Sequence, residues 1–149
     1  FLLNNQLTYF SFEAEHNGEP VANRVEGGKR PRSSMAPSLA FDSDGNLLLS
    51  LGSPGGSRII GYVTLALIAS LDWQMDPQAA VALAHHVNRN GATDLEVGSA
   101  LEALAPGLEA LGHEVKIRPL NSGLHAVRIV AGGLEGGADP RREGVALGQ

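Results

Sequence analysis

The chain has 149 residues, 43% of them hydrophobic and 18% charged, which suits one domain with a sizeable core. A formal net charge of −5, without a basic stripe interleaved with aromatic residues, argues against nucleic acid as a partner. The absence of cysteine excludes a thiol nucleophile, a disulfide framework and a cysteine-based zinc site, and it leaves the compartment open, because a chain without cysteine suits an oxidising or a reducing environment.

The start of the sequence predicts a cut inside a longer protein. The chain begins with Phe1, and no charged segment followed by an apolar core indicates a signal peptide. Residues 1–10 are expected to be the end of a strand that runs into an amide-rich turn. The polar segment Glu13–Arg32 is long for a loop, and loops of that length are usually functional or mobile.

A β-hairpin and two helices are expected next. Ser38–Phe41 and Leu47–Leu51 are apolar runs separated by an Asp/Gly/Asn cluster, and the leucine run predicts a strand buried on both faces. A glycine turn, Gly52–Ser57, leads into an apolar helix over residues 58–71, which is too short to cross a membrane. Asp76 and Pro77 then predict the N-cap and first position of a helix that runs to about His86.

The remaining pattern is that of further strands and one interrupted helix. Ser99 is expected to cap a helix that ends at Gly112, with a kink or split at Pro106. Strands are expected at four places, with the glycine-rich residues 132–137 as a link between the last two: Asp94–Val97, His113–Leu120, His125–Val130 and Gly144–Leu147. The whole of residues 1–149 is therefore interpreted as a single α+β domain.

Three stretches could carry chemistry. The glycine turn 52–57 offers backbone N–H groups at a helix start, where an oxyanion or a phosphate can bind, although such turns are often purely structural. Residues 28–37 combine three cations with two hydroxyls that could hold a carboxylate; the alternative is a solvated basic loop. Asn4, Asn5 and Gln6 could contact an amino-acid substrate or could cap a turn.

Together and in this order, these stretches resemble the small subunit of the γ-glutamyltransferase (glutathione hydrolase) family. The matching blocks are LNNQ at residues 3–6, GKRPRSSMAP at 28–37, GSPGGSRII at 52–60 and GADPR at 137–141. The resemblance implies the four-layer αββα sandwich of N-terminal-nucleophile hydrolases, of which this chain would be the C-terminal part. It also implies a precursor that cuts itself before a Thr, which becomes the nucleophile and would lie upstream of Phe1.

The same resemblance assigns site residues. Gly55 and Gly56 would supply the oxyanion-hole N–H groups, and Ser33 and Ser34 would hold the substrate's α-carboxylate. Gln6 would contact the α-amino group. The implied partners are a large subunit from the same precursor and a small γ-glutamyl or amide substrate, with no cofactor.

One position departs from the family pattern. Where the family usually has an Asp that binds the α-ammonium group, this sequence has Tyr9, and a phenol that is neutral near pH 7 cannot provide a charge-assisted bond. The expected function is γ-glutamyl transfer or hydrolysis, with glutathione as the usual donor. The alternatives are a cephalosporin acylase or small-amide hydrolase with the same mechanism, and a non-catalytic relative.

The remaining titratable residues predict no metal site. His85 and His86 are adjacent, and on a helix they would point about 100° apart. The carboxylate pairs Asp72 with Asp76 and Glu135 with Asp139 are interpreted as capping and surface residues.

Overall fold

The computed structural model describes residues 5–148, which divide between Ser34 and Met35 into two compact units. The first unit contains a 3-10 helix, Gln6–Tyr9, where the amide-rich turn was expected; the strand predicted before it lies outside the described residues. Two short strands, β1 (Glu15–His16) and β2 (Glu19–Pro20), form a hairpin. Its turn residues Asn17 and Gly18 both have positive φ, as tight hairpins require.

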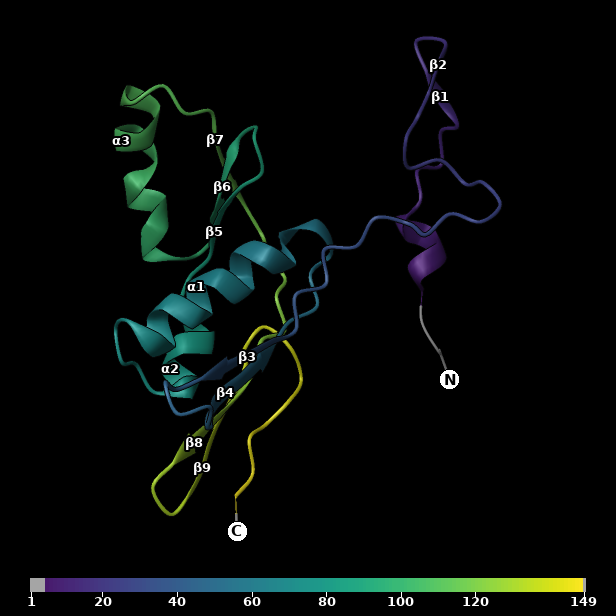
Figure 1. Ribbon diagram of the computed structural model, residues 1–149. Helices are drawn as coiled ribbons and strands as arrows, with labels where there is room; N and C mark the ends of the chain where they lie inside the picture. The colour runs from purple at the N-terminus through teal and green to yellow at the C-terminus, as the bar shows by residue number, and fades with distance from the viewer. Residues whose placement is uncertain (1–4, 149) are drawn as a thin grey trace. The chain divides into compact units, whose positions relative to one another are not determined.

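The second unit is built on a four-stranded antiparallel sheet in the order β3-β4-β8-β9 (Figure 1). Its strands are β3 (Ser38–Phe41), β4 (Leu47–Gly52), β8 (His125–Val130) and β9 (Gly133–Ala138). The β3–β4 hairpin confirms the predicted pair of runs. Asp42 organises its turn by accepting hydrogen bonds from the backbone of Asp44 and Asn46.

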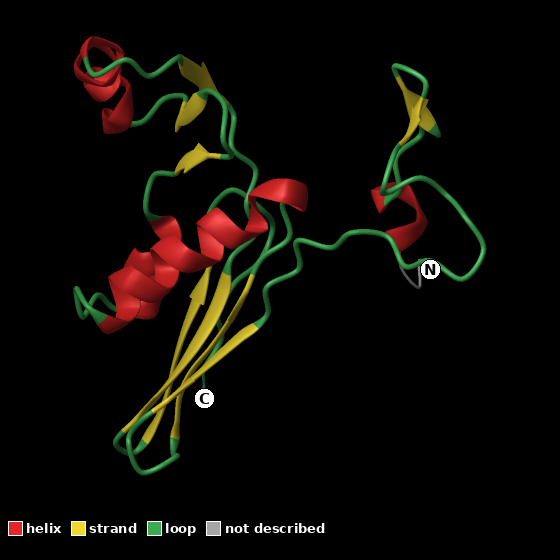
Figure 2. Ribbon diagram, turned by 45° about the horizontal axis from the view of Figure 1, so that its top comes forward, coloured by secondary structure: helices red, strands yellow, loops and turns green. Residues whose placement is uncertain are grey.

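Two helices cover one face of this sheet (Figure 2). They are α1 (Ile59–Leu71) and α2 (Pro77–Ala82), which begin as predicted; Asp76 caps α2 by accepting the N–H of Ala79 at 3.0 Å. One core cluster joins the helices to the sheet. Its members are Leu49, Leu51, Ile59, Tyr62, Val63, Ala66, Val81, Val87, Leu120, Leu124 and Ala126.

The opposite face of the sheet is apolar and exposed. Because side chains alternate along a strand, Leu48 and Ser50 point away from the core that Leu49 and Leu51 enter. The prediction of a strand buried on both faces is therefore wrong within this chain. This outer face also carries the exposed side chains of Leu39, Phe41, Val127, Ile129 and Leu134.

A second sheet has the order β5-β6-β7, with β6 antiparallel to β5 and parallel to β7. Its strands are β5 (His86–Asn88), β6 (Thr93–Glu96) and β7 (Val115–Arg118). The crossover from β6 to β7 is the predicted interrupted helix: a 3-10 segment, Ala100–Leu104, capped by Ser99, and α3 (Ala105–Ala110), with Pro106 in its first turn. The split at Pro106 is thus confirmed.

Three expectations about the elements are wrong. The helix from Pro77 ends at Ala82, because the N–H of His85 bonds the Glu96 carboxylate and His86 already pairs with Leu95 in β5. The glycine-rich segment expected as a link is strand β9, which pairs with β8 over its whole length, whereas residues 144–147 form no strand. Glycine suits β9 where the backbone of α2 comes close.

That close approach gives a stability prediction for Gly137. A Cβ added there would lie 2.5 Å from the carbonyl oxygen of Pro77, which is backbone and cannot rotate away. Gly137→Ala should therefore lower the free energy of unfolding by on the order of 1–3 kcal/mol. Gly133→Ala, in the same strand with no atom within 4 Å of the added Cβ, is the matched control. Urea unfolding of both variants checks this; equal stabilities would contradict it.

Candidate active site

The glycine turn connects the end of β4 to a 3-10 segment, Gly56–Arg58, that continues into α1. Gly55 has φ 140° and Gly56 has φ 59°, conformations that residues with side chains rarely adopt. The carbonyl groups of both glycines accept hydrogen bonds from the N–H groups of Arg58 and Ile59. The first N–H groups of a helix have no partner within it, so the turn directs partial positive charge outward.

The two glycines differ in their surroundings. A Cβ on Gly55 would lie 2.7 Å from Cε2 of Tyr62, so a buried aromatic ring closes that side of the turn. A Cβ on Gly56 would meet no atom within 4 Å. The turn is therefore packed from behind at Gly55 and open at Gly56, which is the arrangement that a ligand approaching the backbone needs.

The segment before β8 supports the turn. The hydroxyl of Ser53 accepts the N–H of Gly123 at 3.2 Å. Gly123 lies so close that a Cβ there would be 2.6 Å from Cγ of Pro54. Arg142 completes this support by donating to the carbonyl of Ser122 at 2.6 Å. The position of the turn thus depends on the position of residues 122 and 123.

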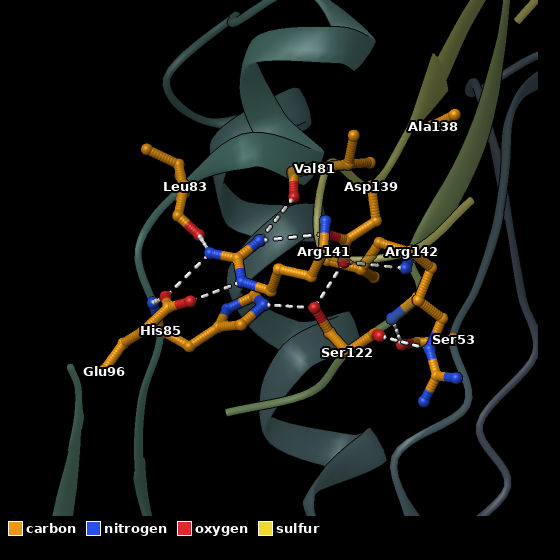
Figure 3. A network of polar contacts seen from close by, with 12 residues as sticks. Ser53, Val81, Leu83, His85, Glu96, Ser122, Ala138, Asp139, Arg141 and Arg142 are labelled. Carbon is orange, nitrogen blue, oxygen red and sulfur yellow. Dashed lines mark hydrogen bonds and ion pairs between the residues drawn. The ribbon is translucent and has the colours of Figure 1, made fainter. Parts of the chain in front are cut away.

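A buried polar network fixes those residues (Figure 3). The Ser122 hydroxyl donates to the Asp139 carboxylate, which also accepts the backbone N–H groups of Leu124 at 3.0 Å and Arg141 at 2.9 Å. Burial alone would raise the pKa of Asp139, but these hydrogen bonds and the Arg141 guanidinium lower it. Asp139 is therefore a buried anion at neutral pH; its interpretation as a surface residue is wrong.

Arg141 joins Asp139 to the second sheet. Its guanidinium donates to both oxygens of Glu96, at 2.5 Å and 2.7 Å, and to Asp139 at 3.0 Å (Figure 3). Burial opposes the charge on Glu96, yet the Arg141 contacts and the N–H of His85 give its carboxyl group a lowered pKa. The guanidinium of Arg141 thus compensates one of the two negative charges. The hydroxyl and backbone N–H groups that bond the two carboxylates stabilise the other.

His85 completes the network as a neutral side chain. Its Nε2 lies 2.7 Å from the Ser122 hydroxyl, and its ring centroid is 4.3 Å from that of Tyr62. Burial, followed by the charge of Arg141, lowers the pKa of His85 to about 4. Since the Ser122 hydrogen is given to Asp139, Nε2 of His85 carries the proton and Nδ1 does not. Nδ1 has no hydrogen-bond partner among the described residues.

In the first unit, three of the predicted substrate contacts line one hollow of about 380 Å³. They are Gln6, Tyr9 and Ser33, and the other lining residues are Arg30, Pro31 and Arg32. Ser34 is half-buried and follows them in the chain. Two guanidinium groups at the wall suit an anionic substrate group, as the three cations of this segment suggested.

Asn23 holds the two sides of this hollow together. Its side-chain amide donates to the carbonyl of Tyr9 at 2.7 Å and accepts the N–H of Arg32 at 2.9 Å. Asn23 was not identified from the sequence, because its neighbouring residues form no motif that indicates this role. His85, Glu96, Ser122 and Arg141 were missed because they meet only in the fold, although the match over residues 137–141 pointed to part of the network.

Within residues 5–148, no group of three or more His, Asp or Glu could hold a metal ion, and no helix is long and apolar enough to cross a membrane.

The buried imidazole predicts how stability depends on pH. The pKa of His85 is about 4 in the folded state and 6.5 in the unfolded chain, so the unfolded chain binds the extra proton as the pH falls between these values. Stability should therefore fall with pH in this window, by about 2 kcal/mol between pH 7 and pH 5. His85→Gln keeps an N–H donor for Ser122 but cannot be protonated, and should reduce this loss.

Urea unfolding at both pH values measures the effect. His86→Gln is the matched control, because it removes a neighbouring imidazole that is exposed. An unchanged pH dependence in His85→Gln would show that another group causes the loss.

The chain is similar to known proteins over its whole length. The family model for gamma-glutamyltranspeptidase matches residues 1–149. A glutathione hydrolase proenzyme of Bacillus subtilis (strain 168) is 34% identical over 151 aligned positions, covering 99% of this chain and 24% of the relative. An acylase ACY 1 proenzyme of Pseudomonas sp. (strain SE83) is 32% identical, covering 96% of this chain and 25% of the relative. The chain thus spans about a quarter of the length of these curated relatives.

The fold is also that of the family. A solved gamma-glutamyltranspeptidase from Pseudomonas nitroreducens, complexed with L-DON, superimposes with a TM-score of 0.82 and 31% identity, covering all of this chain and 82% of the solved one. This match confirms the predicted α+β architecture of the N-terminal-nucleophile hydrolases, of which the four-stranded sheet and its helices form one part. The chain belongs to the gamma-glutamyltranspeptidase family.

Proposed function

We propose that the protein transfers or hydrolyses γ-glutamyl groups through an acyl-enzyme, and that residues 1–149 are the C-terminal part of its small subunit. The nucleophile would be an N-terminal Thr outside these residues, formed when a precursor cuts itself. The observation that carries the proposal is the hollow of the first unit. Gln6, Tyr9 and Ser33 were assigned to the substrate separately, from two blocks of sequence, and they line the same space.

In this reaction, Gly55 and Gly56 would stabilise the oxyanion that forms when the nucleophile attacks the amide. The open side of Gly56 and the start of α1 behind it support this role. Backbone N–H groups fixed in advance are effective here because they need no reorganisation, and one such donor contributes about 2.7–4 kcal/mol.

The hollow of the first unit would bind the γ-glutamyl donor. Ser33 and Ser34 would hold its α-carboxylate, with Arg30 and Arg32 contributing positive charge to the same wall. Gln6 would contact the α-amino group. No metal or cofactor is required by this chemistry.

The partner we propose is a large subunit cut from the same precursor. The relatives with the printed name proenzyme support a cleaved precursor. The apolar outer face of the four-stranded sheet supports a partner that covers it, because exposed apolar patches of this kind mark interaction surfaces. A second sheet placed there would complete the αββα sandwich.

The complete gene product tests the proposal. Mass spectrometry should find two polypeptides, the second beginning with Thr, and the protein should release p-nitroaniline from γ-glutamyl-p-nitroanilide. Gly56→Val should lower kcat by on the order of a hundredfold or more, because a side chain would occupy the oxyanion position. Gly45→Val is the matched control, since Gly45 also has positive φ (85°) and open space around it but lies in the β3–β4 turn.

The outcomes separate the alternatives. An uncut chain without activity would favour a non-catalytic relative. A processed Gly56→Val protein with turnover equal to that of Gly45→Val would overturn the oxyanion assignment while leaving the family reaction in place.

A second candidate function, hydrolysis of amides that lack the α-amino group, is favoured by Tyr9. The half-buried phenol lies in the hollow where the family usually has a carboxylate, and the similarity to an acylase proenzyme supports the same change of substrate. Loss of a charged partner costs about 1.5–3 kcal/mol, or roughly ten- to a hundredfold in binding.

Tyr9→Asp should therefore shift the ratio of kcat/KM for γ-glutamyl over glutaryl anilide upward by roughly ten- to a hundredfold. Tyr9→Asn is the control, because it changes size without adding charge, and both variants keep the backbone carbonyl that Asn23 binds. A strong native preference for the γ-glutamyl donor that neither variant changes would mean that Tyr9 does not set specificity.

A further inference from the structure

A second hollow, of about 250 Å³, lies on the β5-β6-β7 sheet. Its wall consists of Arg89, Gly91, Ala92, Asp94, Lys116 and Arg118. Lys116 and Arg118 are two residues apart in β7 and therefore share one face of the sheet. Arg89 comes from the turn between β5 and β6. Side chains from three separate positions thus converge on the same space.

The charges in this hollow do not balance. Asp94 is the one carboxylate among its lining residues, against three cations. A fourth cation, Arg58, already occupies Asp94: its Nη2 and Nε lie 2.7 Å and 3.0 Å from Oδ2. Arg118 reaches only the other oxygen of Asp94, at 3.5 Å. The negative charge of Asp94 is therefore largely compensated before Arg89, Lys116 and Arg118 are counted.

The remaining partners add little negative charge. Lys116 pairs with Glu114 at 2.8 Å, but both side chains are more than half exposed, and such pairs contribute little. Arg89 donates to the Ser57 hydroxyl, which is neutral. In a chain with a net charge of −5, this hollow is a local positive site, and its guanidinium groups keep N–H donors that bond to nothing within residues 5–148.

We propose that this hollow binds a small anion carrying two or more negative charges, as carboxylate or phosphate groups. Arg89 and Arg118 would each contribute a planar fork of N–H donors, and Lys116 would contribute a point charge between them. The volume is below that of most pockets for drug-sized molecules, which limits the ligand to a compact anion. The positive charges of the three side chains would repel a cation. Because Arg89 also bonds Ser57, which follows Gly56 directly, the bound anion would lie next to the glycine turn.

Calorimetric titration of the processed, full-length protein tests the site. Inorganic phosphate and citrate are the probes, at ionic strength held constant with NaCl, and saturable binding of one ion per protein is expected. Tighter binding of phosphate or of citrate identifies the preferred group. Arg89→Gln and Arg118→Gln should each weaken binding about tenfold or more, as expected for loss of charge-assisted hydrogen bonds.

Two controls distinguish binding at this hollow from a general effect of the protein's net charge. Arg24→Gln removes one positive charge from the first unit, where Arg24 pairs with Glu26, and should leave the affinity unchanged. Glu114→Gln removes the acid beside Lys116 and should strengthen binding. The ion pairs of Asp94 within residues 5–148 are with Arg58 and Arg118 and not with Arg89, so Arg89→Gln remains informative if Arg118→Gln disturbs the sheet. Absence of saturable binding, or an equal loss in Arg24→Gln and Arg89→Gln, would overturn the proposal.

Discussion

The carboxylate of Asp139 accepts hydrogen bonds from four donors where solvent barely reaches: the Ser122 hydroxyl, the N–H of Leu124, and the N–H and guanidinium of Arg141. An unpaired buried carboxylate is very costly, so these donors must all be in place for the second unit to fold as it does. They come from both sides of the β8–β9 hairpin. The contacts of Ser122 and Gly123 then extend this constraint to the glycine turn, and Arg141 extends it to β6 through Glu96.

The sequence predicted those elements whose determinants are local. The Asp42 turn, the Asp76–Pro77 start of α2 and the break at Pro106 each depend on residues within one turn of the feature. Strand β9 was missed because its glycines disfavour a strand locally, and the close approach of α2 to Gly137 becomes visible only in the fold. The length of α2 was overestimated for a similar reason, since pairing in β5 takes over from helical propensity.

The residues of the candidate site also differ in whether local sequence or only the fold identifies them. Gly55, Gly56 and the proposed substrate-binding residues were assigned by resemblance, since these residues lie in short contiguous blocks of sequence. The geometry adds what no block contains, namely that Tyr62 closes the turn behind Gly55 and that Asn23 joins Tyr9 to Arg32. The network of His85, Glu96, Ser122, Asp139 and Arg141 spans more than fifty residues, and no spacing rule connects its members. Only the fold shows which of these residues contact one another.

The apolar outer face of the four-stranded sheet has a consequence for the order of assembly. While two parts of a precursor remain covalently joined, each meets the other at an effective concentration set by the connecting chain, commonly in the millimolar range. In the proposed precursor, docking over Leu39, Phe41, Val127 and Ile129 would then be an intramolecular step that competes well against aggregation. Once the peptide bond is cut, the same association becomes bimolecular. In the proposed precursor, self-cleavage that follows folding would let this sheet be covered before it could encounter another molecule, and the cut itself would remove no contact that holds the two subunits together.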